Sequence, residues 1–227
     1  KVLNYFTRFE IGLWTTSVLL ILLSFFAFDR GNYLTLIASI IGATFLIFNA
    51  KGNPIGQFLT IIFSILYGII SYGFSYYGEM ITYLGMSMPM AIFAFISWLK
   101  NPYNNDKTEV KVNKLSKKEI VFMFVLTAFV TIVFYYILKY FNTSNLIPST
   151  FSVTTSFLAV YLTFRRSPYF ALAYAMNDLV LIVLWVLASI KEISYLSVVI
   201  CFAVFFVNDM YGFINWKRIE KKQNKNG

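Results

Sequence analysis

Eight stretches of this chain are apolar and long enough to cross a lipid bilayer, and no other feature constrains the fold as strongly. The hydrocarbon core of a bilayer is crossed by roughly 20 residues of α-helix. The stretches cover residues 11–28, 33–50, 55–77, 80–99, 119–141, 147–164, 168–190 and 194–216. Polar breaks such as Gly78-Glu79 separate them, and Pro54 and Pro168 stand at two predicted helix starts. The sequence therefore predicts an all-α membrane protein with eight transmembrane helices.

Composition excludes several classes of function. The chain has no histidine and a single cysteine, Cys201, so histidine-based catalysis and an internal disulfide are impossible. We expect no transition-metal site, no cofactor and no enzymatic activity, because no catalytic set or phosphate-binding glycine loop is present in the sequence. The first apolar stretch is not followed by a small-residue cleavage site, so we interpret it as a retained helix.

The basic residues indicate how the chain is oriented. Of the 19 Lys and Arg residues, 16 fall on the side of the N-terminus, and Arg30, Lys139 and Lys191 fall on the other. The positive-inside rule then places both termini in the cytoplasm. Because these charges lie between the spans, we predict no nucleic-acid partner. The lysine-rich loop 100–118 is expected to contact anionic membrane lipid.

Two triplets of predicted helices repeat one pattern. Their lengths are 18, 23 and 20 residues in the first triplet and 18, 23 and 23 in the second, and Pro54 corresponds to Pro168 at an offset of 114. One linker helix separates them, so the repeats are parallel, and such transporters bind substrate near the midplane between repeats. The plan is 1 + (3+1+3): residues 1–30, an extra helix; 31–100, the first repeat; 101–145, a cytoplasmic linker loop and linker helix; 146–218, the second repeat; 219–227, a cytoplasmic tail.

Two Asn-Asp pairs stand well inside two predicted spans. Asp178 follows Pro168 by ten residues, about 15 Å of helix, and Asp209 precedes Trp216 by seven, about 10 Å. A carboxylate at this depth is costly unless it faces water, a partner or a ligand. We therefore predict that Asn177, Asp178, Asn208 and Asp209 bind a substrate. Two alternatives are hydrogen bonds that join helices and, for the carboxylates, a role in proton coupling.

The remaining polar and aromatic residues indicate the class of substrate. No Lys or Arg stands in the middle of a span, which argues against a phosphorylated substrate. Carboxylates with aromatic neighbours suit a cationic ring. Further candidate binding residues are Trp185, Phe170, Tyr174, Tyr67 and Gln57. Trp98 and Trp216 end their helices, and we expect them to be anchors at the membrane interface.

Four segments resemble the PnuC family of bacterial vitamin transporters. They are residues 50–72 (AKGNPIGQFLTIIFSILYGIISY), 78–85 (GEMITYLG), 175–185 (AMNDLVLIVLW) and 207–216 (VNDMYGFINW). The resemblance extends over residues 11–218. It implies a 3+1+3 core like that of full-length SWEET transporters, a variable extra helix, a homotrimer, and a location in the bacterial inner membrane.

The resemblance also implies a function. Members of this family carry nicotinamide riboside into the cytoplasm by facilitated diffusion, and a kinase then traps it as a step toward NAD. The family's substrate-binding asparagine matches Asn177, but the Trp-x-x-Trp motif before it is replaced by Phe170 and Ala173. Thiamine or a deoxynucleoside is therefore an alternative substrate. An alternative from another class is a membrane sensor or scaffold without flux.

Overall fold

The computed structural model describes residues 5–73 and 76–226, and it confirms the eight predicted membrane spans. The helices are α1 (Arg8–Phe28), α2 (Tyr33–Ala50), α3 (Pro54–Gly73), α4 (Tyr77–Thr82), α5 (Met88–Lys100), α6 (Lys117–Tyr140), α7 (Leu146–Phe164), α8 (Tyr169–Ser189) and α9 (Leu196–Asn226). A π-helical turn, Tyr83–Ser87, joins α4 to α5, so these two form one span, and a 3₁₀ turn, Ile193–Tyr195, precedes α9. The π turn ends next to Pro89, whose missing N–H interrupts the regular hydrogen-bond pattern.

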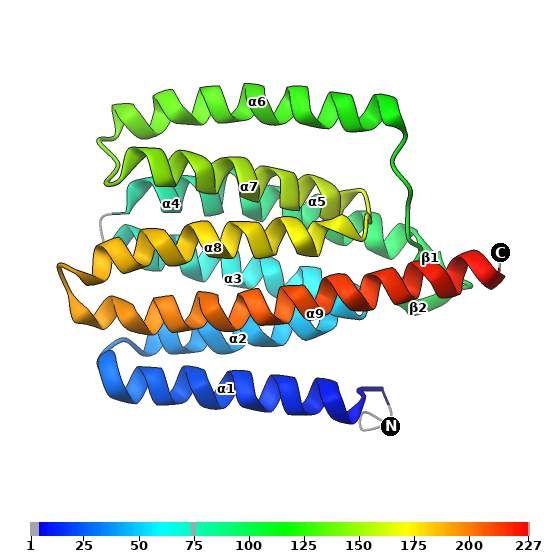
Figure 1. Ribbon diagram of the computed structural model, residues 1–227, viewed down its shortest axis with the longest axis horizontal. Helices are drawn as coiled ribbons and strands as arrows, with labels where there is room; N and C mark the ends of the chain where they lie inside the picture. The colour runs from blue at the N-terminus through cyan, green and yellow to red at the C-terminus, as the bar shows by residue number, and fades with distance from the viewer. Residues whose placement is uncertain (1–4, 74–75, 227) are drawn as a thin grey trace.

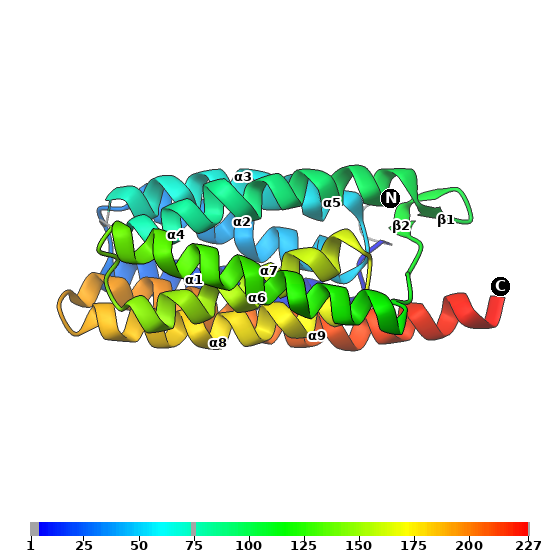
Figure 2. The same cartoon turned by 90° about the horizontal axis from the view of Figure 1, so that it is seen from above.

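The helices run side by side as a bundle, and the start of α1 and the end of α9 lie at the same end (Figure 1). We call this the terminal end, and the other the opposite end. Within the bundle, six helices form a closed ring in which each packs on its two neighbours. In order they are α2, α3, α5, α7, α8 and α9. The ring contains both predicted triplets, and their contacts are α2 with α9 and α5 with α7. Figure 2 shows the same bundle from above.

The two helices outside the ring occupy related places. Helix α1 packs against α2 and α9, whereas α6 packs against α7. In Figure 1 they lie on opposite sides of the bundle. Each is therefore next to the first helix of the triplet that follows it. Their outward faces carry exposed apolar residues such as Leu23 and Val125, 65% and 64% exposed, as expected of surfaces that face lipid.

The segment after α5 differs from the loop that the sequence predicts. It forms an antiparallel hairpin of β1 (Pro102–Tyr103) and β2 (Asp106–Val110). Asn104 and Asn105 at its turn have φ angles of 49° and 60°, as a two-residue type I′ turn requires. Hydrogen bonds from Thr108 hold the pKa of the exposed Asp106 carboxyl below its ordinary value.

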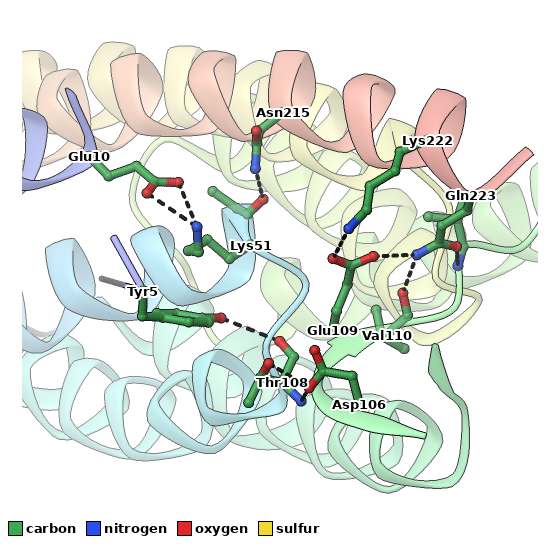
Figure 3. Close-up of polar contacts among 12 residues, drawn as sticks. Tyr5, Glu10, Lys51, Asp106, Thr108, Glu109, Val110, Asn215, Lys222 and Gln223 are labelled. Atoms are coloured by element: carbon green, nitrogen blue, oxygen red, sulfur yellow. Dashed lines mark hydrogen bonds and ion pairs between the residues drawn. The ribbon is translucent and has the colours of Figure 1, made fainter. Parts of the chain in front are cut away.

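The hairpin is fastened to the terminal end of the bundle (Figure 3). The Val110 N–H donates to the Gly52 carbonyl at 2.9 Å, and the Gln223 side chain donates to the Val110 carbonyl at 3.0 Å. Gly52 has a φ of 67°, a left-handed conformation that favours glycine, at the turn between α2 and α3. The hairpin thus connects the first triplet to the end of α9.

Candidate functional site

A small cavity of about 40 Å³ lies at the centre of the helix ring. Its lining comes from both triplets: Phe45, Leu46, Asn49, Thr60, Phe63, Ser64, Tyr83 and Ser87 from the first, and Ser156, Tyr174, Asn177, Asp178, Phe202, Phe205 and Asp209 from the second. The lining includes four of the predicted binding residues, namely Tyr174, Asn177, Asp178 and Asp209. The described residues contain no group of three or more His, Cys, Asp or Glu side chains that could hold a metal ion.

Two carboxyl groups meet in this cavity. Asp178 on α8 and Asp209 on α9 are buried, 4% and 5% exposed, and their side chains are close enough to interact. Two carboxyl groups that share a buried site are stable together when they share one proton, which leaves one negative charge. No Lys or Arg is among the lining residues, so nothing in the lining neutralises the remaining negative charge. The pair therefore offers a binding partner for a cation.

Asn177 is held in place by hydroxyl groups of α7. Its Oδ1 accepts hydrogen bonds from Thr155 at 2.8 Å, from Ser156 at 3.0 Å and from Ser152 at 3.5 Å. With the oxygen engaged in this way, the side-chain NH₂ group is the part of Asn177 that can donate to a ligand. The serine and threonine residues of α7 thus fix the orientation of this amide.

The first triplet contributes a second fixed amide, Asn49 on α2, which we had not predicted from the sequence. Its Oδ1 accepts a hydrogen bond from Gln57 at 2.8 Å, and its Nδ2 donates to Thr60 at 3.4 Å. Gln57 itself does not line the cavity, so its contribution is to orient Asn49. Asn49 stands two residues before Lys51, at the end of a predicted span. Polar residues are common there, so the sequence pattern did not mark Asn49 as a binding residue.

Aromatic rings form the other wall of the cavity. Phe63 lies 5.2 Å from Phe45 and 5.7 Å from Phe205 between ring centroids, and Phe202 lies 5.6 Å from Phe205. Gly42 allows the ring of Phe205 to pack directly against α2, because a Cβ at this position would overlap it. The lining therefore combines polar groups, around Asn177 and the two carboxyl groups, with a set of aromatic rings. None of these phenylalanines was singled out among the chain's 25.

The other predicted binding residues lie away from the cavity lining. Asn208 points toward α1, where its Nδ2 donates to Ser17 Oγ at 2.9 Å. Phe170 packs at the terminal end, with its ring 4.9 Å from Trp216. Tyr67 and Trp185 belong to an aromatic cluster nearer the opposite end, with their rings 6.3 Å apart. A binding role for these four residues stays a prediction.

At the terminal end, the two triplets are joined by a reciprocal pair of hydrogen bonds. The Trp98 Nε1–H donates to the Thr163 carbonyl at 2.9 Å, and the Trp216 Nε1–H donates to the Asn49 carbonyl at 2.7 Å. The two accepting residues are 114 positions apart, the same offset as the two prolines. Both tryptophans are 0% exposed, so the expectation that they anchor the protein at the membrane interface is wrong.

At the opposite end, the cluster around Tyr67 has a different character. The rings of Tyr67 and Tyr83 are 4.5 Å apart, and those of Tyr76 and Trp185 are 5.0 Å apart. Glu79 is the third residue of α4, at the same end of the bundle, and its side chain is buried at 1% exposure. The terminal end is thus closed by paired indole groups, whereas the opposite end encloses a buried carboxylate.

Comparisons with known proteins agree with this architecture. The "Nicotinamide riboside transporter PnuC" of Neisseria mucosa is 28% identical over 225 residues, covering 96% of this chain and 84% of the relative. The protein of the same name from Haemophilus influenzae is 24% identical over 194 residues, covering 85% and 83%. The crystal structure of the vitamin B3 transporter PnuC superposes with a TM-score of 0.83 at 22% identity, covering 96% of this chain and 94% of that one. This likeness confirms the fold.

A family match decides what kind of protein this is. Residues 32–218, well over half of the chain, match the family described as nicotinamide mononucleotide transporter. Together with the eight apolar spans, the match identifies a multi-pass bacterial membrane protein that acts as a transporter and not as an enzyme. The predicted resemblance to PnuC proteins is confirmed, and the chain belongs to the nicotinamide mononucleotide transporter family.

Proposed function

We propose that this protein carries nicotinamide riboside across the membrane by facilitated diffusion. The observation that supports this substrate is the pair of carboxyl groups, Asp178 and Asp209, in a cavity whose lining contains no Lys or Arg. Nicotinamide mononucleotide carries a phosphate, which proteins bind with cationic groups or clusters of donors. The riboside lacks this phosphate and keeps the positively charged pyridinium ring. The charge of the cavity therefore favours the riboside.

Each wall of the cavity matches one part of this substrate. The carboxyl pair attracts the pyridinium charge, and the rings of Phe63 and Phe205 provide faces for a planar cationic ring. The NH₂ group of Asn177 donates to a ribose hydroxyl or to the carboxamide oxygen. In this arrangement the phenylalanines of the first triplet and α9 supply the stacking surface that Ala173 cannot.

The size of the cavity indicates that binding requires a change of shape. Pockets for ligands of drug size have volumes of about 300–1,000 Å³, whereas this cavity measures about 40 Å³. The triplets therefore separate at one end or the other to admit the substrate, as in alternating access by movement of repeats.

The distribution of charge gives the direction of transport. With 16 of 19 basic residues on its side, we place the terminal end in the cytoplasm and the opposite end outside. A cytoplasmic kinase then traps the riboside by phosphorylation. We also propose that the protein is a homotrimer, and that its exposed apolar helix faces contact membrane lipid.

Transport by purified protein in liposomes tests this proposal. We expect uptake of labelled nicotinamide riboside in counterflow and no uptake of the mononucleotide. The matched variants are Asn177→Ala, which removes the cavity amide, and Asn208→Ala, which removes an amide that faces α1. The first should lose uptake. The second tests the sequence-based prediction for Asn208: retained uptake would mean that this amide only joins helices, and lost uptake that it also serves binding.

Other results would redirect or overturn the proposal. Uptake of the mononucleotide would contradict the argument from charge. Uptake of thiamine or of a deoxynucleoside in place of the riboside would keep the transporter and change its substrate. Binding without uptake of any of these compounds would support a sensor without flux.

A further inference from the structure

Glu79 is a buried carboxylate without a cationic partner. The described residues contain four ion pairs, and none of them involves Glu79. Ser152 on α7 makes a hydrogen bond with its side chain, but Oε2 accepts none from the described residues. The side chain is 1% exposed. By contrast, the buried Glu10 is paired with Lys51 at 3.2 Å.

Such a group destabilises the fold unless a bound partner compensates for its lost hydration. A buried carboxylate loses its hydration, and an oxygen without a donor does not recover it. Glutamine at position 79 could accept the same hydrogen bond from Ser152 without a charge. The presence of the acid therefore indicates a ligand that interacts with the negative charge.

The surroundings of Glu79 indicate the class of that ligand. Tyr76 and Tyr83 stand three residues before and four residues after Glu79, within about one helical turn on either side, and the Tyr67 ring lies 4.5 Å from that of Tyr83. Trp185 packs against both Tyr67 and Tyr76. Aromatic faces around a carboxylate are the environment that proteins use to bind organic cations.

This cluster is continuous with the central cavity. Glu79, Tyr83 and Ser87 follow one another at spacings of four along the α4–α5 span, and the last two line the cavity. On the facing helix α7, the Ser152 hydroxyl is within reach of both Glu79 and Asn177 and can donate its one proton to either. A polar track therefore leads from Glu79 to the cavity.

We propose that Glu79, with Tyr67, Tyr76 and Tyr83, forms a second subsite that binds an aromatic cation between the outside and the central cavity. The inference rests on the proposed function and adds a site that the substrate binds before it reaches the central cavity. It assigns Tyr67 to this outer subsite.

The test compares two substrates that differ in charge. Nicotinamide riboside is cationic, whereas its dihydro form is neutral and of nearly the same shape. For Glu79→Gln in liposomes, we expect the KM for the riboside to rise by about tenfold, while the KM for the dihydro form stays unchanged. An unchanged KM for the riboside would overturn the proposal.

A further variant separates binding from folding. Glu79→Asp keeps the charge and should retain most of the preference for the cation. If Glu79→Gln and Glu79→Asp instead reduce transport of both substrates equally, Glu79 has a structural role and the subsite is excluded.

A binding measurement distinguishes this inference from the proposed function. If the unaltered protein takes up neither substrate, the proposed function fails. 1-Methylnicotinamide, a pyridinium cation without the ribose, is then titrated against the protein in detergent. Binding that is weakened about tenfold in Glu79→Gln would support the subsite independently, and equal binding to both proteins would exclude it.

Discussion

The two ends of the helix ring close the cavity by opposite means. At the terminal end, Trp98 and Trp216 each donate a hydrogen bond to a carbonyl of the other triplet, and their rings lie 5.4 Å apart. At the opposite end, the aromatic cluster encloses Glu79, one of whose oxygens accepts no hydrogen bond from the described residues. Both indole N–H groups of the first closure are paired, whereas the second contains a buried carboxylate oxygen that accepts no hydrogen bond from the described residues.

This difference shows which end is prepared to receive a ligand. In a membrane interior, every polar group that lacks a partner is costly, so opening the terminal end costs the two hydrogen bonds that the indole N–H groups now donate. Opening the opposite end breaks fewer such bonds and gives Glu79 access to water or a cation. We therefore expect the terminal end to be the more stable closure.

The largest expected effect is at the terminal tryptophans. Trp216→Ala removes a fully buried ring and should lower the free energy of unfolding in detergent by about 3–5 kcal/mol. Trp216→Phe keeps a ring and removes the indole N–H, while the Asn49 carbonyl still accepts from the Gly52 N–H, so a smaller loss of about 0.5–1.5 kcal/mol is expected. Thermal and denaturant unfolding measure both.

A third tryptophan is the control for this prediction. Trp14 on α1 is 37% exposed and also donates a hydrogen bond, to Thr44 at 3.1 Å. Because it lies outside the ring, Trp14→Ala should cost clearly less than Trp216→Ala. Equal losses would mean that the reciprocal bonds are not what holds the terminal end.

These tryptophans also show where prediction from the sequence succeeds and fails. Apolar length is a local property, so the eight spans and their order could be predicted. The depth of a carboxylate along a helix is equally local, which is why Asp178 and Asp209 were correctly expected at similar depth. A tryptophan at a helix end is typical of the interface, and only the packing of the other triplet reveals that Trp98 and Trp216 are buried.

The remaining parts of the site depend on contacts between distant segments. Glu79 follows a glycine between two apolar stretches, which is also the pattern of a turn, yet it lies inside α4. Asn208 and Asn177 have the same neighbour in the sequence, but Asn208 faces α1. Which side of a helix faces the cavity is decided by packing, and in stretches that are apolar all round the pattern does not reveal it.

A smaller effect on stability is expected when one substitution is made near each end of a single helix. Both Gly56 and Gly68 lie on α3, toward the terminal and the opposite end respectively. A Cβ at Gly56 would meet the Asn49 backbone nitrogen at 2.7 Å, whereas a Cβ at Gly68 would meet the Leu84 side chain at 2.6 Å. Backbone cannot move aside as a leucine side chain can.

We therefore expect different results from the same substitution. Gly56→Ala should lower the free energy of unfolding by about 1–3 kcal/mol, because it displaces α2 and Asn49. At Gly68, rotation of Leu84 and the higher helix propensity of alanine, worth about 1 kcal/mol, should leave stability nearly unchanged. Equal losses at both sites would show that the opposite end is as tightly packed as the terminal end.

The smallest expected effect concerns the hairpin at the terminal end (Figure 3). The Gln223 side chain donates to Glu109 and to the Val110 carbonyl, both at 3.0 Å, and accepts from the Val112 N–H at 2.8 Å. Gln223→Ala removes all three bonds at the bundle's edge, where water replaces part of what is lost. We expect a change of about 1 kcal/mol in local opening, seen as faster hydrogen exchange at Val112.

The neighbouring ion pair is the matched control. Lys222 is bonded to Glu109 at 3.1 Å, but its side chain is 57% exposed, and pairs of this kind contribute about 0–1 kcal/mol. Lys222→Ala should therefore leave exchange at Val112 almost unchanged. If it accelerates exchange as much as Gln223→Ala does, charge and not the buried amide fastens the hairpin. High salt would then loosen the hairpin, and its attachment to the terminal end would depend on ionic strength.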